Sequence, residues 1–237
     1  PPGVLAVVTS ADFPGSNRDS TVDYGEGDRA LWQLRSNSMA IGKVHYKGQA
    51  VAGVAAVNVH VAEEACNLIE VEYEVLPAVT SVLDAMKDDA PLLHEDQTTE
   101  RFGEKTDKAS NIASHFQHKL GDADAGFSEA DVVIEREFHT ATVHQGYLEP
   151  HNATVFWNQD GRVTIWCSTQ GSFMIRNSVA DVLRYPVSKI KVIPMEIGGG
   201  FGAKGIIYSE PVAALLAKKA NKPVKVTMSR TEVFEAS

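Results

Sequence analysis

Cysteine is scarce in this sequence of 237 residues, which contains Cys66 and Cys167 and no C-x-x-C pair. An iron–sulfur cluster or a zinc ribbon held by this chain alone is therefore excluded, and the scarcity is typical of a reducing compartment such as the cytoplasm. Long apolar runs are also missing, since no stretch approaches the roughly 20 residues that cross a bilayer. Basic residues are too few for a nucleic-acid or anionic-membrane surface, because 31 acidic residues face 22 basic ones and the formal net charge is -9.

The rest of the composition is that of an ordinary globular protein. Hydrophobic residues make up 43% of the chain and charged residues 22%, which is enough for one large or two small packed domains. The start, Pro1-Pro2-Gly3, runs directly into a strand-like segment, and the end carries no terminating signal. We therefore expect the chain to be part of a longer protein.

The first predicted domain spans residues 1–85 and mixes strands with one helix. An apolar strand begins at Val51, and a helix follows with Asn58 as its N-cap. The helix places one set of residues on a common face: Ala62, Ala65, Cys66 and Ile69. A second strand alternates Val71, Tyr73 and Val75 with Glu70, Glu72 and Glu74, which predicts a sheet with one face in solvent.

Residues 86–110 are polar and interrupted by proline, which predicts a connecting segment. The second domain, residues 111–237, resumes with strands at Val132–Ala141, Ala153–Trp157 and Arg162–Thr169, the last two joined by a hairpin turn. A helix follows, with core positions predicted at Phe173, Val179 and Leu183. The strand KIKVIPMEI comes next, and after it a helix is predicted with Ser209 as N-cap and Pro211 in its first turn. The strand VKVTMS is the last predicted element, and it completes an α/β (α+β) fold.

A glycine-rich segment, EIGGGFGAKG, separates KIKVIPMEI from the helix at Ser209. Gly200-x-Gly202-x-x-Gly205 fits the dinucleotide pattern, so an NADP-dependent oxidoreductase, with Arg230 reading a phosphate, is one hypothesis. Pro194 in the preceding strand and the late helix start at Pro211 weaken it. The alternative is a tight loop whose amide N–H groups form a concave donor surface.

Several segments together resemble one known family. GGGFGAK, the stretches KGQAVAGVAA and AEEACNLIEVEYEVLPAV, and then HQGYLEPHNATVFW, WCSTQGSF and KPVKVTMSR occur in the order found in molybdenum hydroxylases. The chain is similar to the large molybdopterin-binding subunit of the xanthine dehydrogenase, aldehyde oxidase and aerobic carbon monoxide dehydrogenase relatives. The resemblance implies a hammerhead-like α/β domain followed by the first part of a molybdopterin-binding α+β domain.

The resemblance also implies roles for particular residues. Gln170 is expected beside an oxygen ligand of molybdenum, as an amide that orients and tunes the metal site. Main-chain contacts to the cofactor are expected from Phe201 and Gly202, with Gly199 and Gly200 shaping the loop. The Leu148-Glu149-Pro150 segment is expected near the active cavity, which makes Glu149 a candidate catalytic residue. No residue of this chain is expected to bind the metal directly, since the pterin dithiolene holds it.

The implied activity is that of a molybdenum-dependent oxidoreductase. It would hydroxylate an aldehyde or an N-heteroaromatic small molecule with oxygen derived from water. The molybdenum–molybdopterin cofactor would be shared with a second molybdopterin-binding domain. Iron–sulfur and FAD domains or subunits would be partners, and the general base would lie outside this chain. The isolated chain is therefore expected to be inactive, and a non-catalytic assembly fragment remains an alternative.

Other chemically capable residues have simpler interpretations. His115 and His118 are expected to be surface residues, because a spacing of three points two strand residues to opposite faces. Arg176 is expected at the surface or in a structural pair. Cys167 is expected to be a small buried apolar residue, since no histidine is placed by sequence to activate it. His151, which would share a strand face with Glu149, is expected either at a substrate pocket or in solvent.

Overall fold

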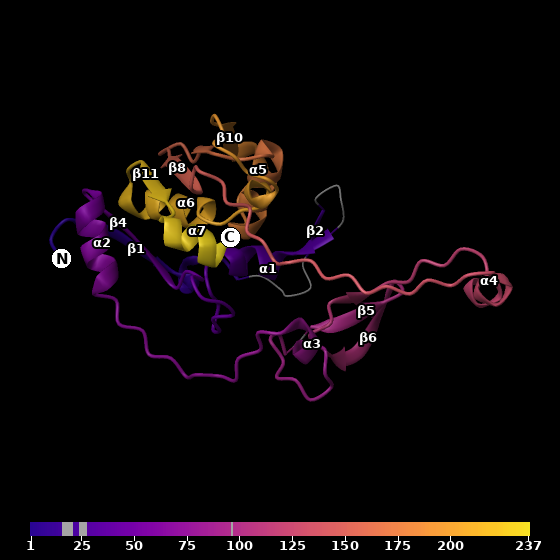
Figure 1. The fold of residues 1–237 in the computed structure, drawn as a ribbon. Coiled ribbons are helices and arrows are strands. Elements are labelled where there is room, and N and C mark those ends of the chain that lie inside the picture. The colour runs from indigo at the N-terminus through magenta and orange to yellow at the C-terminus, as the bar shows by residue number, and fades with distance from the viewer. Residues whose placement is uncertain (16–20, 24–27, 96) are drawn as a thin grey trace. The chain divides into compact units, whose positions relative to one another are not determined.

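The computed structural model describes residues 1–15, 21–23, 28–95 and 97–237, and it divides into two compact units. Unit 1 comprises Pro1–Glu70 with Val143–Ser237, and unit 2 comprises Val71–Thr142 (Figure 1). Residues 16–20 and 24–27 of the first predicted domain, and residue 96 of the predicted connecting segment, lie outside the described residues. Helices and mixed sheets confirm the α+β class. The domain boundaries expected at residues 85 and 110 stay a prediction.

The second half of unit 1 contains a four-stranded sheet. Its order is β10 (Ile190–Pro194), β9 (Val163–Cys167), β8 (Asn152–Trp157) and β11 (Val224–Thr227). The predicted hairpin is confirmed, since β8 and β9 pair antiparallel. β10 pairs parallel with β9 and forms one edge of the sheet, while β11 pairs antiparallel with β8. Consequently the chain leaves the edge strand β10 beside the end of β9.

The helix α6 (Glu210–Ala220) is the centre of the unit 1 core. It contacts β8 of the four-stranded sheet and also the antiparallel pair β1 (Val4–Thr9) and β4 (Ala52–Ala56), as Figure 1 shows. Small residues let strand and helix approach closely: a Cβ on Gly53 would lie 2.8 Å from Val212 Cγ1. Because α6 is covered on both sides, its apolar residues are buried around most of its circumference.

Shorter elements complete unit 1. The pair β2 (Thr21–Asp23) and β3 (Asp28–Ala30) precedes α1 (Leu31–Ser38), and α7 (Arg230–Ala236) follows β11. The predicted helix after β9 is confirmed as α5 (Ser172–Val182), with Val179 buried. The prediction that Phe173 is a core residue is wrong, since its side chain is 70% exposed. Ile175 takes the buried position on that turn of the helix.

The predicted helix of the first domain is confirmed as α2 (Val59–Asn67). Asn58 caps it, because the Val61 amide donates to Asn58 Oδ1 at 3.0 Å. Of the residues expected on a common face, Ala65 is buried and Cys66 is exposed, while Ile69 lies beyond the end of the helix. The helix therefore rests on β4 by a narrow contact rather than by a wide apolar stripe.

Unit 2 contains a small sheet with the order β6 (Glu104–Ala109), β5 (Thr98–Arg101) and β7 (Ser114–His115). The short helices α3 (Val82–Ala85) and α4 (Ala123–Glu129) precede and follow it. The antiparallel pair of β5 and β6 falls inside the stretch 86–110 that was predicted to be a connecting segment. That segment therefore carries secondary structure that its polar composition did not reveal.

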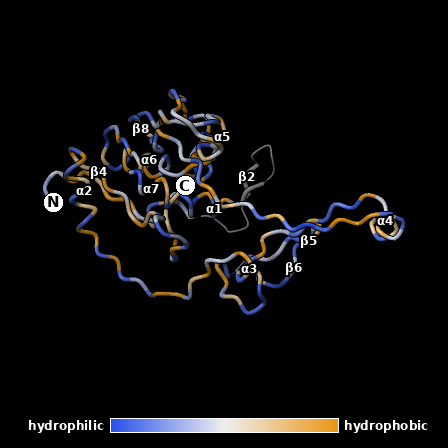
Figure 2. Tube along the Cα trace, in the orientation of Figure 1, coloured by the Kyte–Doolittle hydropathy of each residue, from blue (hydrophilic) through white to orange (hydrophobic). Residues whose placement is uncertain are grey.

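Two predicted strands of unit 2 do not form. Residues 71–75 and 132–141 have no ladder pairing in the described structure, although both stretches contain apolar as well as polar residues (Figure 2 colours the chain by hydropathy). Their apolar side chains are exposed, with Val75 at 90% and Phe138 at 86%. A strand-like pattern forms a strand only when another segment pairs with it, and that segment cannot be identified from the pattern itself. Among the described residues, no helix is both long and apolar enough to cross a bilayer.

Candidate functional site

The glycine loop, residues 198–205, joins β10 to α6 through a short 3₁₀ turn at Ala203–Gly205. Gly199 and Gly202 have φ of +91° and +96°, a conformation that side chains rarely adopt. Phe201 adopts φ of +53° without being glycine, and its side chain is 73% exposed. A non-glycine residue in this region carries backbone strain, which is common where a chain is shaped for binding. The loop therefore projects Phe201 outward on a backbone that its neighbours hold in place.

Gln170, at the end of β9, is bound to this loop on its oxygen side. Its Oε1 accepts hydrogen bonds from the amides of Gly202 at 3.0 Å and Lys204 at 3.2 Å. The main-chain N–H of Gln170 donates to the Lys204 carbonyl at 3.0 Å. Because Oε1 is used by two donors, the orientation of the side-chain amide is fixed, and Nε2 is turned away from the loop as a hydrogen-bond donor.

The close approach of Gln170 explains one of the glycines directly. A Cβ on Gly200 would lie 2.7 Å from Gln170 Oε1 and 2.8 Å from its Cδ. Any other residue at position 200 would push the amide away from the loop. The sequence hypothesis required Gln170 and the Phe201–Gly202 peptide to lie together, and the structure brings them together.

Glu149 lies against the other end of the loop. Its Oε2 accepts from the Gly198 amide at 2.8 Å and from Lys204 Nζ at 2.7 Å, and its Oε1 accepts from Asn152 Nδ2 at 3.1 Å. Burial acts to raise the pKa of this carboxyl, but the hydrogen bonds from Lys204, Gly198 and Asn152 and the charge of Lys204 outweigh it and lower the pKa. Glu149 is therefore an ionised carboxylate that accepts three hydrogen bonds, two of them on Oε2.

Lys204 is the residue of this site that the sequence reasoning missed. Its side chain is 0% exposed, and the ammonium also lies 5.0 Å from the centre of the Tyr147 ring. A lysine surrounded by small residues in a tight loop was the available signal, because a long side chain there has to turn either to solvent or into the core.

His151 was expected at a substrate pocket or in solvent, but the structure buries it beneath the loop, with 2% exposure. Its Nε2 lies 3.3 Å from the Ala203 carbonyl oxygen and its Nδ1 lies 2.7 Å from the Tyr147 hydroxyl. Burial lowers the pKa of His151 to about 4, and the nearby Lys204 charge acts in the same direction. The neutral ring therefore donates from Nε2 to the carbonyl, which can only accept, and accepts at Nδ1 from the tyrosine.

The dinucleotide hypothesis does not fit this geometry. β10 is an edge strand, and α6 starts at Glu210, five residues after Gly205, so the helix N-terminus is not part of the glycine pattern. Arg230 is also occupied, since Nη1 donates to the Tyr147 carbonyl at 2.8 Å and Nη2 donates to the Leu148 carbonyl. Both observations weigh against a nicotinamide site.

The remaining candidates have structural roles. His115 and His118 are exposed, and the described part of the chain holds no group of three or more His, Cys, Asp or Glu that could bind a metal. Arg176 lies over the Phe173 ring and donates to Asn177, in agreement with a surface role. Cys167 is buried, and burial raises the pKa of its thiol to about 12, so it is not an activated nucleophile.

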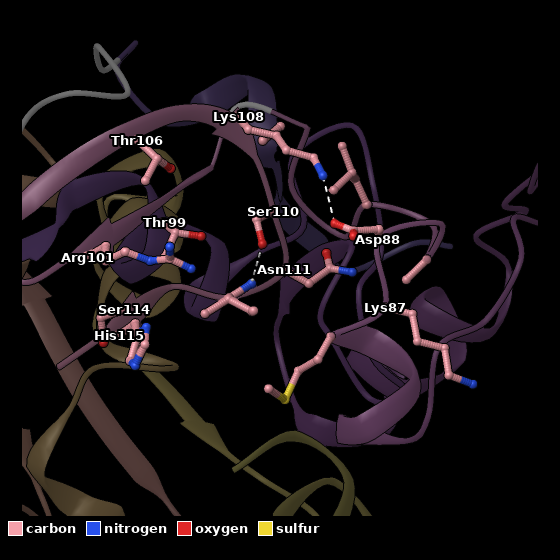
Figure 3. Close-up of a pocket in the computed structure, with 15 residues that line it drawn as sticks. Lys87, Asp88, Thr99, Arg101, Thr106, Lys108, Ser110, Asn111, Ser114 and His115 are labelled. Carbon is pink, nitrogen blue, oxygen red and sulfur yellow. Dashed lines mark hydrogen bonds and ion pairs between the residues drawn. The ribbon is translucent and has the colours of Figure 1, made fainter. Parts of the chain in front are cut away.

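Unit 2 contains a separate cavity of about 620 Å³, drawn in Figure 3. Arg101, Lys108 and His115 line it together with several hydroxyl groups. Lys108 is already paired with Asp88 at 2.7 Å across an exposed surface. None of the residues expected to act on a cofactor lies there, so the loop of unit 1 remains the better candidate.

Known proteins match the whole of this arrangement. Residues 104–237 match the model of the molybdopterin cofactor-binding domain, and residues 1–77 match the aldehyde oxidase and xanthine dehydrogenase a/b hammerhead domain. The chain belongs to the molybdenum hydroxylase family. The hammerhead-like domain and the first part of a molybdopterin-binding domain, both expected from the sequence, are thereby confirmed.

Individual relatives support the same assignment. The chain is 30% identical to a xanthine dehydrogenase molybdenum-binding subunit of Escherichia coli, over 100% of this chain and 30% of the relative. It is 31% identical to the nicotinate dehydrogenase large molybdopterin subunit of Eubacterium barkeri, over 97% and 49%. Quinoline 2-oxidoreductase from Pseudomonas putida 86 is a structural match with a TM-score of 0.79 and 26% identity, over 98% and 28%. The chain thus spans between about a quarter and a half of the length of these relatives.

Proposed function

We propose that this chain forms one wall of the cofactor site of a molybdenum hydroxylase. The observation that carries the proposal is the Gln170 side-chain amide, whose oxygen accepts from the Gly202 and Lys204 amides at 3.0 and 3.2 Å, which leaves its Nε2 as an oriented donor. The site offers neutral hydrogen-bonding groups and backbone rather than metal ligands. This donor set fits a metal that arrives already chelated by an organic cofactor.

The proposed cofactor is molybdenum–molybdopterin, which when bound supplies the two-electron redox chemistry that this chain lacks. Gln170 would donate to it from Nε2, and the Phe201–Gly202 peptide would contact it through the main chain. Gly199 gives the loop its left-handed turn, and Gly200 leaves room for the Gln170 side chain. Phe201, which is 73% exposed, would exclude water from the cofactor once the rest of the pocket is in place.

A catalytic role for Glu149 stays a prediction. Its oxygens already accept three hydrogen bonds, one of them from the Lys204 ammonium, and its pKa is lowered. A carboxylate held in this way is a poor general base, because the hydrogen bonds and the Lys204 charge that lower its pKa also lower its affinity for a proton. The proposal therefore gives Glu149 the task of holding the loop, and it places the general base elsewhere in the full protein.

The proposed reaction is hydroxylation of an aldehyde or an N-heteroaromatic small molecule with oxygen derived from water. Relatives named for xanthine, nicotinate and quinoline support the heteroaromatic class. Iron–sulfur and FAD domains or subunits and a second molybdopterin-binding domain are the proposed partners, and electrons would leave through the first two. Because Cys66 and Cys167 are both unpaired, we place the protein in the cytoplasm.

Metal analysis of the complete complex tests this function. We expect close to one molybdenum atom per copy of this chain, and a strong loss of molybdenum and activity in Gln170→Ala. Lys191→Met, which changes an exposed residue of the strand that leads into the loop, serves as the control and should retain both. A complex without molybdenum, together with saturable binding of NADP(H), would instead favour the nicotinamide alternative. A complete complex that holds no cofactor and is inactive would favour an assembly role.

A further inference from the structure

Lys204 is a fully buried charged residue inside the glycine loop. Its side chain is 0% exposed, although lysine is almost never fully buried without a partner. Transfer of an ammonium group out of water is costly, and a buried ion pair is often no more stable than an apolar replacement of similar size. Overall stability therefore gives a weak reason for this pair, and its position in the site gives a stronger one.

The main chain of Lys204 forms the template on which Gln170 rests. The Lys204 amide donates to Gln170 Oε1 at 3.2 Å, and its carbonyl accepts from the Gln170 amide at 3.0 Å. The same carbonyl accepts from Thr169 Oγ1 at 3.2 Å. The residue at position 204 is thus joined to the end of β9 by three hydrogen bonds, and any displacement of its backbone displaces Gln170.

The side chain of Lys204 ties the same residue to the opposite end of the loop. Lys204 Nζ lies 2.7 Å from Glu149 Oε2, and that oxygen also accepts from the Gly198 amide at 2.8 Å. The backbone of Glu149 donates to the Gly198 carbonyl at 3.1 Å. The Glu149 carboxylate therefore joins Gly198, the first residue of the loop, to Lys204, whose backbone holds Gln170. The stretch between them contains two glycines with positive φ.

We propose that Lys204 is a positioning residue, whose ion pair with Glu149 closes the glycine loop and holds the Gln170 amide in place. The inference rests on the proposed cofactor site, and it adds a device that keeps a glycine-rich loop rigid without adding side chains to its binding face. A direct catalytic use of Lys204 is excluded by geometry, because its ammonium is fully buried against Glu149 and Tyr147. Its effect has to pass through the loop.

The pair can be tested in the complete cofactor-loaded complex by two readouts. Hydrogen exchange should report the Gly198, Gly202 and Lys204 amides, and the loss of molybdenum with time should report cofactor retention. We expect Lys204→Met to speed exchange of these amides and loss of molybdenum by at least about tenfold each. Lys204→Arg, which keeps a charged donor, should restore part of both effects. Lys191→Met is the matched control and should change neither.

A double variant separates positioning from simple stability. Glu149→Gln combined with Lys204→Met removes both charges, so the unfolding temperature should recover in part relative to Lys204→Met alone, because the half-buried Glu149 carboxylate, 28% exposed, no longer lacks its cation. If the pair positions the loop, exchange and molybdenum loss should remain fast in this stable variant. If both readouts recover together with the unfolding temperature, the role is merely structural and the inference is overturned.

The other outcomes are equally decisive. If Lys204→Met does not fold, the double variant and Glu149→Gln carry the test, since each removes the pair. Loop protection and molybdenum retention like those of the unaltered complex in these variants would overturn the inference. If the unaltered complex contains no molybdenum, the proposed function fails, while loop exchange in the same variants still decides whether the ion pair holds Gln170.

Discussion

Acidification should destabilise this protein through His151 before it affects the carboxylates of the site. Burial lowers the pKa of His151 from 6.5 to about 4, so the native ring stays neutral at pH values where the unfolded chain takes up a proton. The contribution of neutral His151 is fully present above the unfolded pKa and is lost as pH falls from 6.5 toward about 4. Glu149 also has a lowered pKa, so its contribution is lost in the same direction as pH falls, but at lower values, below 4.5.

The size of the effect follows from the two pKa values of His151. A change from 6.5 to about 4 corresponds to about 3 kcal/mol of unfolding free energy, since each pKa unit is worth 1.36 kcal/mol. About 2.5 kcal/mol of this should be lost between pH 7 and pH 4.5. The native hydrogen bonds explain the cost, because a protonated Nδ1 would lose its role as acceptor for the Tyr147 hydroxyl.

Urea unfolding at pH 7 and pH 4.5, followed by tryptophan fluorescence, measures this loss in the unaltered protein and in His151→Gln. Glutamine at position 151 takes up no proton. From pH 7 to pH 4.5 the free energy of unfolding of the variant should therefore fall by about 2.5 kcal/mol less than that of the unaltered protein. His118→Gln, which replaces an exposed histidine, is the matched control for loss of a histidine. Equal pH dependence in His151→Gln and the unaltered protein would refute the reasoning, since the buried neutral ring would then contribute nothing.

Two other predictions concern a close approach and a helix cap. Gly200→Ala should lower the free energy of unfolding by about 1 to 3 kcal/mol and reduce bound molybdenum, because its Cβ would lie 2.7 Å from Gln170 Oε1. Gly205→Ala, with open space around the added Cβ and no positive φ, should have little effect in urea unfolding and metal analysis, and equal effects of the two substitutions would contradict the steric argument. Asn58→Ala should cost about 1 kcal/mol in urea unfolding through loss of the bond from the Val61 amide, and an unchanged midpoint would show that α2 does not depend on its cap.

Local patterns predicted much of unit 1 correctly. The turn between β8 and β9, the cap at Asn58, and the proline in the first turn of α6 all act within a few residues, so they can be read without knowledge of the fold. The roles expected for Gln170 and Phe201-Gly202 came from the resemblance of several segments to a family, and they stay a prediction. Neither residue would have been selected from its chemistry alone.

Long-range partners account for the errors. The segments at 71–75 and 132–141 were predicted to be strands, yet the structure leaves them without a ladder. Phe173 lies on the face of α5 that turns to solvent, although its hydrophobicity suggested the core. In each case strand pairing or burial depended on what another part of the chain placed opposite, which the local sequence does not show.

The sequence alone determined the turn between β8 and β9, the starts of α2, α5 and α6, and that residues 198–205 form a glycine-rich loop, because these properties depend on neighbouring residues. The tertiary structure decided that Lys204 is buried against Glu149, that His151 is neutral beneath the loop, and that Gln170 is held through its oxygen. Lys204 is 34 residues from Gln170 and 55 residues from Glu149 in the sequence. Whether these residues meet therefore depends on the register of β8, β9 and β10. Charge and protonation at this site are consequences of that packing, and packing is not visible in a local pattern.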